Sequence, residues 1–184
     1  MRYHNFAEVP LYKAFEFIEP GPVILLVTSE DGKPNIMTLS WSVLIDFDPI
    51  IGCVLSPGDY SYEILRKTKE CVLAIPAADI IEKAVQIGNC SGEDTDKFQK
   101  FALSPLKASH VKAPLIKECL VNIECIVTDI IDKYGLFVME GVKAWIDKDK
   151  SEKRTFHANG DGTFVIDGEI KNLKHLMTKW QQFT

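Results

Sequence analysis

Short runs in which apolar and polar residues alternate recur along the chain, and this period of two is typical of β-strands. Residues 23–28 are apolar and β-branched, and Asp31-Gly32 carries the signal of a hairpin turn. A returning strand is expected over residues 35–43. Its alternate residues form two faces, with Ile36, Thr38 and Ser40 on one and Met37, Leu39 and Trp41 on the other.

The same pattern predicts further strands over residues 49–56, 71–76, 115–129 and 135–145, and a short one following the tight turn within 159–169. Short helices are expected after Asp59 or Ser61, which can cap a helix, and over 79–88 and 96–103. Near the end of the chain, helical spacing predicts one apolar stripe: Leu173, Leu176, Met177 and Trp180. We therefore predict a mainly β fold, a closed or nearly closed antiparallel barrel with peripheral helices, formed by residues 1–184 as one domain.

Composition narrows the class of protein. The chain has 184 residues, of which 46% are hydrophobic and 10% aromatic, enough for a substantial core. The formal net charge of −5 comes with no basic stripe, which argues against nucleic acid as the main partner. No apolar run reaches the length of a membrane span, and residues 1–20 lack the apolar region of a signal peptide. The five cysteines contain no CxxC pair, so we expect reduced thiols in a cytoplasmic protein.

Several common sites are excluded by their motifs. The sequence has no GxGxxG fingerprint, no P-loop and no GxSxG elbow. The four histidines lack the spacing of metal ligands. Residues 159–169 faintly resemble a calcium loop, but Thr163 and Val165 stand where that loop needs its oxygen ligands, and a hairpin turn is the better interpretation. We expect no metal site.

Small hydroxyl residues gather in three segments at expected strand ends: 37–42, 55–62 and the stretch GNCSGEDTDKF at 88–98. A phosphate monoester is bound by hydroxyls, by backbone N–H groups at a helix N-terminus and by one or two cations. A flat aromatic ring needs an apolar wall and hydrogen bonds at its polar edge. The rim of a barrel offers both.

These segments also resemble the flavin reductase-like family, an FMN-binding split barrel, and within it the flavoredoxin-type branch. The resemblance rests on PGPVILLVTSEDGKPNIMTLSW, then DPIIGCVLSPGDYSYEILRKTKECVLAIP, then GNCSGEDTDKF, and it spans about residues 20–128. It implies non-covalent FMN bound at the interface of a homodimer. It also implies that the first segment runs beside the isoalloxazine and ribityl chain, the second approaches the phosphate, and the third covers it and supplies a positive charge. The implied residues are Met37, Thr38, Leu39, Ser40 and Trp41, then Ser56, Ser61 and Tyr62, then Ser91, Gly92 and Lys97.

Simpler roles compete for some of these residues. Thr38 and Ser40 fit a solvent-facing strand, Trp41 fits a core aromatic, and Asp96-Lys97-Phe98 fits the capped start of a helix with Phe98 in the core. We expect Cys53 and Cys90 to be bystanders to any redox chemistry, because neither has a partner cysteine nearby in the sequence.

Three functions remain open. The first is an FMN-dependent flavin or ferric reductase that takes its electrons from NADH or NADPH. The second is a flavoredoxin-like electron-transfer protein reduced by a protein partner, and the third is an FMN-binding protein without turnover. No acid–base pair is evident, and the sequence names no catalytic residue. Such chemistry is carried by the cofactor, while the protein orients it and tunes its potential.

Overall fold

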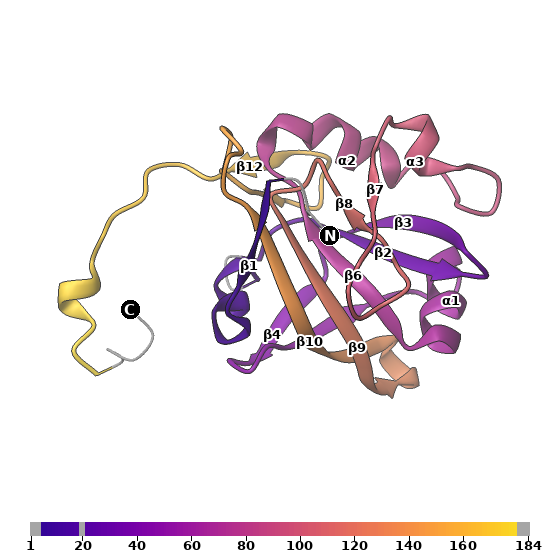
Figure 1. The fold of residues 1–184 in the computed structure, drawn as a ribbon, viewed down its shortest axis with the longest axis horizontal. Coiled ribbons are helices and arrows are strands. Elements are labelled where there is room, and N and C mark those ends of the chain that lie inside the picture. Colours follow the sequence, from indigo (N-terminus) through magenta and orange to yellow (C-terminus); the bar gives the residue numbers. More distant parts are fainter. Residues whose placement is uncertain (1–4, 19–20, 180–184) are drawn as a thin grey trace.

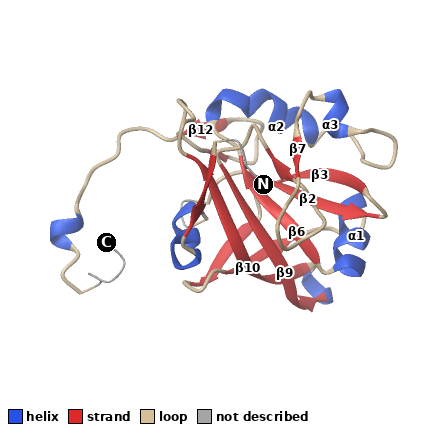
Figure 2. Cartoon of the chain, viewed as in Figure 1, coloured by secondary structure: helices blue, strands red, loops and turns tan. Residues whose placement is uncertain are grey.

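The computed structural model describes residues 5–18 and 21–179, and an antiparallel β-sheet dominates this part of the chain (Figures 1 and 2). Its strands follow the order β3-β2-β6-β9-β10-β5-β4, and β1 pairs with β10 as well. In chain order these are β1 (Phe6–Val9), β2 (Ile24–Glu30), β3 (Lys33–Leu39), β4 (Ser42–Asp46), β5 (Ile50–Val54), β6 (Glu70–Ile75), β9 (Val121–Ile131) and β10 (Leu136–Asp147). The predicted mainly β, antiparallel architecture is confirmed.

The sheet is curled into a split barrel. Strands β3 and β4 are consecutive in the chain but lie at opposite ends of the strand order, and only Ser40 and Trp41 connect them. The prediction of one strand over residues 35–43 is therefore wrong. The chain leaves β2 at Leu39 and pairs with β5 from Ser42 onward, so Trp41 is exposed between the two strands and is not a core aromatic.

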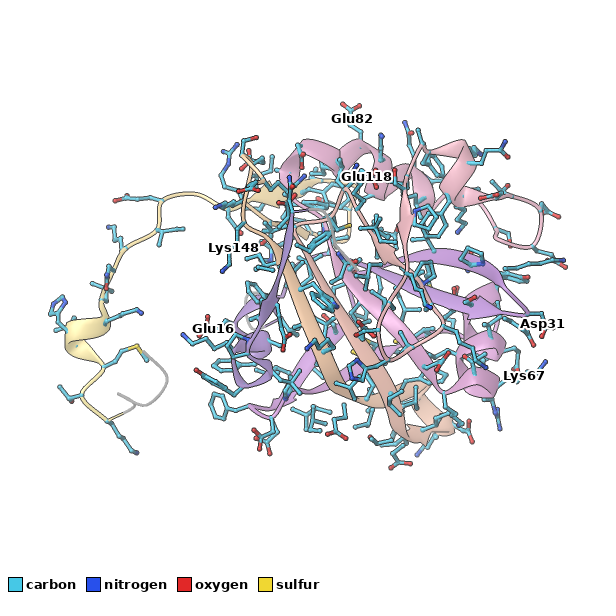
Figure 3. The ribbon with its side chains drawn as sticks, viewed as in Figure 1. Glu16, Asp31, Lys67, Glu82, Glu118 and Lys148 are labelled. Carbon is cyan, nitrogen blue, oxygen red and sulfur yellow. The ribbon has the colours of Figure 1, made fainter. Side chains whose placement is uncertain are left out.

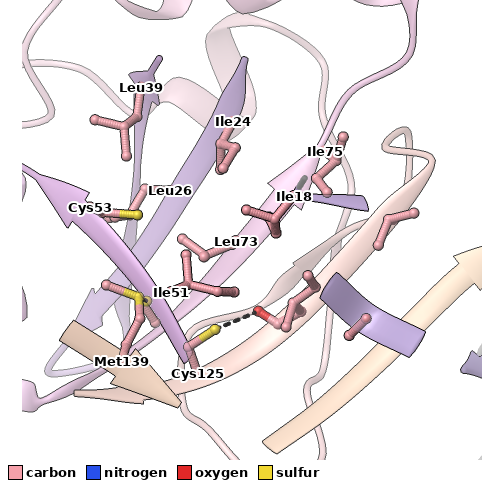
Figure 4. Close-up of a cluster of buried hydrophobic side chains, with 14 of the residues drawn as sticks. Ile18, Ile24, Leu26, Leu39, Ile51, Cys53, Leu73, Ile75, Cys125 and Met139 are labelled. Carbon is pink, nitrogen blue, oxygen red and sulfur yellow. Dashed lines mark hydrogen bonds between the residues drawn. The ribbon is translucent and has the colours of Figure 1, made fainter. Parts of the chain in front are cut away.

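Apolar side chains fill the inside of the barrel. Each strand turns alternate residues inward, and Ile24 and Leu26 of β2 meet Leu73 of β6 and Ile51 of β5 there (Figure 4). Three thiols belong to the same cluster. Cys71 is the cross-strand partner of Cys125 and contacts the Met139 sulfur at 3.6 Å, and Cys53 lies with them in this core.

Helices and short strands cover two surfaces of the barrel. Helix α1 (Tyr60–Thr68) contributes Tyr62 and Leu65 to the inner cluster. A second apolar cluster lies outside β2, β3 and β6, beneath the 3-10 helix η2 (Ala78–Ile80), α2 (Ile81–Ile87), α3 (Lys97–Lys100), β7 (Pro105–Leu106) and β8 (Leu115–Ile116) (Figure 1). The expected helix 96–103 is shorter, but its start is as predicted, because Asp96 caps it by accepting from the Gln99 N–H and Phe98 is buried. Charged side chains such as Asp31 and Glu82 project outward (Figure 3).

The strand expected over residues 115–129 is divided in two. Asn122 is fully buried, and its side chain bonds both backbone groups of Ile116, accepting from N–H at 2.8 Å and donating to the carbonyl at 3.1 Å. This pairing folds residues 117–120 into a turn between β8 and β9, so Cys119 packs in the outer cluster while Cys125 faces inward. The other long strand is close to the prediction, because β10 spans Leu136–Asp147 where 135–145 was expected.

A buried carboxylate fixes the loop between β7 and β8. Glu124, on β9, accepts hydrogen bonds from the Ser109 N–H and hydroxyl, the His110 N–H and the Trp145 indole N–H. Burial raises the pKa of Glu124, but these hydrogen bonds outweigh burial and hold the pKa below its ordinary value of 4.5. The anchored loop in turn covers the outer apolar cluster.

The last part of the chain departs from the body of the molecule (Figure 1). Strands β11 (Phe156–Ala158) and β12 (Phe164–Ile166) form the predicted terminal hairpin. The prediction of a helix after this hairpin is wrong for the described residues, which form only a 3-10 turn there, η4 (Lys174–Leu176). Trp180, the last member of the predicted stripe, lies outside the described residues.

Two further 3-10 helices, η1 (Leu11–Phe17) and η3 (Asp132–Tyr134), complete the fold. None of the described helices is long and apolar enough to cross a membrane.

Candidate cofactor site

A cavity of about 390 Å³ opens where β3, the start of α1 and the segment after α2 meet. Its walls come from all three hydroxyl-rich segments that the sequence analysis selected. The lining residues are Asn35, Met37, Thr38, Gly58, Asp59, Tyr60, Ser61, Gly88, Asn89, Cys90, Ser91, Gly92 and Lys97. Three stretches that are far apart in the sequence thus line one cavity.

Asn35 joins two of these walls. Its side-chain nitrogen donates to the Ser61 hydroxyl at 2.8 Å, which ties β3 to the first turn of α1. The Asn35 Oδ1 atom is buried and has no hydrogen-bond partner among the described residues. A buried acceptor without a donor is costly, by about 1–3 kcal/mol. The Asn35 amide therefore leaves one unsatisfied acceptor next to the cavity.

The segment after α2 closes tightly over Asn35. A Cβ atom placed on Gly92 would lie 2.0 Å from Asn35 Oδ1 and 2.9 Å from Tyr60 Cδ1, so no side chain fits at this position. This close approach accounts for the glycine in the SG pair and brings Ser91 to the cavity wall.

Lys97 places a cation at the cavity. Its side chain is only 5% exposed, and its Nζ donates to the Ile36 carbonyl at 2.7 Å. Burial lowers the pKa of Lys97, and no ion pair of the described residues includes it. An ammonium group has three protons to donate, so a bound anion would receive those that the carbonyl leaves free.

The start of α1 adds backbone donors. Asp59 precedes the helix, but its carboxylate accepts from the Ser56 N–H at 2.8 Å and does not cap the helix. In the described part of the chain, the N–H groups of Tyr60 and Ser61 have no hydrogen-bond partner, whereas that of Tyr62 bonds the Asp59 carbonyl. Free N–H groups at a helix N-terminus favour an anion, and the buried Lys97 lines the same cavity.

Six of the eleven predicted residues line this cavity: Met37, Thr38, Ser61, Ser91, Gly92 and Lys97. Met37 offers a half-buried apolar wall. The Thr38 hydroxyl donates to the Ala84 carbonyl at 2.6 Å, so its proton is committed to α2. The roles of these six residues in binding a ligand stay predictions.

The other five predicted residues lie elsewhere. Leu39 faces the barrel interior, because β3 turns alternate residues inward up to its end. Ser40 and Trp41 are exposed in the crossing to β4, and Ser56 is exposed in the turn before α1. Tyr62 packs edge-to-face on Phe137, with ring centroids 5.2 Å apart, because it projects from α1 into the core.

Sequence reasoning missed other lining residues, chiefly Asn35, Tyr60 and Cys90. Asn35 carried a signal, since it is an amide on the face of the strand that also holds the apolar Met37 and Leu39. The thiols divide clearly: Cys90 is half-buried at the cavity, whereas Cys53 is fully buried and burial raises its pKa.

Fold and cavity together define a class of protein: a split barrel with a cavity, lined in part by a buried lysine, beside its first hairpin. Residues 18–164 match the family model of the flavin reductase like domain, and the chain belongs to this family. The predicted family and split-barrel fold are thereby confirmed.

Solved structures show the same fold. An FMN-binding domain of a flavin reductases-like enzyme from Shewanella baltica aligns with a TM-score of 0.85 at 23% identity, covering 94% of this chain and 99% of that one. The flavoredoxin of Desulfovibrio vulgaris (Miyazaki F) aligns with a TM-score of 0.75 at 24% identity, covering 83% and 89%. Among sequence relatives, an uncharacterized protein of Archaeoglobus fulgidus is 31% identical over 128 residues, covering 68% of this chain and 72% of its own.

Proposed function

We propose that the protein binds FMN non-covalently in this cavity and works as a redox-active flavoprotein. The observation that carries the proposal is Lys97, a buried cation with no ion-pair partner in the described residues, at a cavity also lined by Tyr60 and Ser61 at the start of α1. Membership of the flavin reductase like family and the fold shared with the FMN-binding domain from Shewanella baltica support FMN as the bound anion.

The residues present fit such a cofactor. Lys97, Ser61 and the start of α1 would hold the phosphate, and Met37 would give an apolar wall. When bound, FMN supplies hydride and electron transfer. The contribution of the chain is to bind and orient the cofactor and to shield it from water, and no catalytic acid or base is assigned.

The enzymatic form of the proposal is an FMN-dependent oxidoreductase, a flavin or ferric reductase that uses NADH or NADPH. The family to which the chain belongs supports this form. We further propose a homodimer, since β3 and β4 are sheet edges and edge strands need cover. The five cysteines are all free thiols, which supports the cytoplasmic location.

A second candidate, an electron-transfer protein served by a protein partner, is favoured by a neighbouring hollow. This hollow of about 530 Å³ shares Asn35, Tyr60 and Gly92 with the cofactor cavity. Its walls include three acids, Glu93, Asp94 and Asp96, and one cation, Lys33. Acidic walls repel the pyrophosphate of a nicotinamide dinucleotide and suit a basic partner.

Anaerobic mixing separates the two candidates. The FMN-loaded protein is mixed with NADH or NADPH, and the visible flavin absorbance is followed. Rapid bleaching by either nucleotide supports the reductase. Persistence of the absorbance with both nucleotides, together with rapid bleaching by a reduced redox protein, supports the carrier. If the flavin absorbance persists with every donor, the result supports an FMN-binding protein without turnover.

A further inference from the structure

An exposed apolar face lies on the outside of the barrel at its β4 edge. Trp41, Val43 and Ile45 occur at alternate positions along this edge and are 69%, 53% and 51% exposed. A Cβ atom on Gly52 of β5 would lie 2.9 Å from Val43 Cγ1 and 3.1 Å from Leu136 Cδ1, so these side chains pack directly over the Gly52 backbone and form one continuous apolar surface. We call Trp41, Val43, Ile45 and Leu136 the β4 face.

A second unburied apolar set follows the terminal hairpin. The chain is held to the body up to Asp167, whose carboxylate accepts from the Thr155 N–H at 3.0 Å, the Thr155 hydroxyl at 2.6 Å and His157 Nε2 at 2.8 Å. Residues 168–179, here called the arm, come next and extend away from the barrel (Figure 1).

The apolar side chains of the arm are not covered by the barrel from which it comes. Ile170 is 93% exposed and Leu176 66%, and Leu173 and Met177 are also exposed. The hydrogen bonds described for residues 169–178 all run to partners within that segment. Four exposed apolar residues within eight positions exceed what a solvated tail requires, and such a set marks a contact surface.

The charge of the arm and the distance that it can span indicate that it packs on the β4 face. The arm contains three lysines, Lys171, Lys174 and Lys179, and one acid, Glu169. The end of β4 and the turn that follows it expose two acids, Asp46 and Asp48. Ten residues separate Asp167 from Met177, and an extended chain of that length reaches about 33 Å. This span is long enough to cross from one barrel to a neighbouring copy.

We propose that the arm of one copy packs on the β4 face of a second copy, and that the two copies exchange arms symmetrically. A two-fold dimer makes this contact twice, with apolar residues of the arm on Val43 and Ile45 and its lysines near the β4–β5 turn. The inference rests on the homodimer put forward under the proposed function, and it assigns the interaction surface.

Cross-linking of two distinguishable chains tests the contact. Both chains carry Cys90→Ser, which removes the one cysteine that is not fully buried. One tagged chain also carries Leu176→Cys, the other carries Val43→Cys, and the two are co-expressed and mildly oxidised. A covalent species containing both tags is expected on a non-reducing gel. The control pairs Leu176→Cys with Glu82→Cys, an exposed position on α2, and should give no such species.

A single chain carrying both Leu176→Cys and Val43→Cys identifies the alternative. If its disulfide forms only within one chain, the arm covers its own barrel and the proposal is wrong. In the otherwise unmodified protein, Leu176→Asp should raise the dimer dissociation constant at least roughly tenfold, because a charge replaces a buried apolar contact. Asn172→Asp, in the same arm, should change it little. Equal dissociation constants for the two variants would also overturn the proposal.

The FMN content of each sample separates this inference from the proposed function. Bound FMN without a mixed cross-link would leave the cofactor assignment intact and reject the arm. A mixed cross-link, together with an otherwise unmodified protein that takes up no FMN, would support the arm and reject the cofactor.

Discussion

The side-chain nitrogen of Asn35 donates to the Ser61 hydroxyl at 2.8 Å, and this bond joins strand β3 to the first turn of α1 at the cavity that both line. The two residues are 26 positions apart and both are buried. The bond orients the Ser61 oxygen toward Asn35, so the hydroxyl proton is available to a ligand.

Ser61→Ala is therefore expected to weaken FMN binding roughly five- to hundredfold, the loss of about 1–3 kcal/mol for a hydroxyl contact to an anion. Fluorescence titration of apoprotein with FMN measures the change. Ser56→Ala is the matched control, because Ser56 lies five residues earlier, is exposed and does not line the cavity. Equal losses in the two variants, or none in Ser61→Ala, would move the phosphate site away from α1.

Cys90 offers a chemical probe of the cavity. It is half-buried at the cavity wall, whereas Cys53, Cys71, Cys119 and Cys125 are fully buried. Burial raises the pKa of the Cys53, Cys119 and Cys125 thiols, so they should stay protonated and unreactive in the native protein. Native apoprotein should expose one reactive thiol to an alkylating reagent, and bound FMN should slow its reaction.

The control for this probe is Cys90→Ser, which should show no native reactivity and full reactivity of the remaining thiols after unfolding. The Cys53→Ser/Cys90→Ser variant should still allow FMN reduction, because we assign neither thiol a redox role. Alkylation of Cys90 at the same rate with and without saturating FMN would place the cofactor elsewhere. Loss of reduction with FMN still bound would point to a thiol in the electron path.

Glu124 should make the free energy of unfolding depend on pH in the acidic range. Its folded-state pKa lies below 4.5 despite burial, because Trp145, Ser109 and His110 donate to its carboxylate. A depressed pKa contributes stability that is fully present above the unfolded value and is lost as the pH falls through the folded value. Wild-type protein should therefore lose part of its free energy of unfolding below about pH 4.5 through this group.

Glu124→Gln should lower the free energy of unfolding near neutral pH by about 1–3 kcal/mol, since an amide N–H₂ would meet backbone donors in a buried site. The deficit relative to wild type should shrink in acid, as the wild-type carboxylate itself becomes protonated. Chemical denaturation at several pH values measures both effects. Glu82→Gln, at an exposed position, is the control. A deficit that does not vary with pH would contradict the role of the charge.

Local pattern predicted much of the fold. The β2–β3 hairpin, β5, β6 and β10 follow from alternation and turn residues. Asp96 as a helix cap and Phe98 as a core residue follow from a short motif. Such features depend on neighbours in sequence, so a single chain suffices to predict them.

Long-range contacts explain what the sequence could not predict. The end of β3 is set by a change of partner from β2 to β5, which moved Ser40 and Trp41 away from the cavity. Lys97 could be chosen as a cation, but its bond to Ile36, 61 residues away, could not be foreseen. The terminal stripe at Leu173, Leu176 and Met177 has helical spacing, but its side chains stay exposed and unpacked, so only a 3-10 turn forms there.

The most direct test compares FMN with riboflavin, which lacks the phosphate, by titration of wild type and Lys97→Met. Wild type should bind FMN far more tightly than riboflavin and should release FMN, not FAD, when the purified protein is denatured. Lys97→Met should lose roughly five- to hundredfold in FMN affinity and little in riboflavin affinity, because the buried ammonium acts on the phosphate alone. Lys100→Met, one helical turn away at an exposed position, should behave as wild type. A wild-type protein that takes up no FMN, or a Lys97→Met variant that keeps the full preference for FMN over riboflavin, would contradict the account.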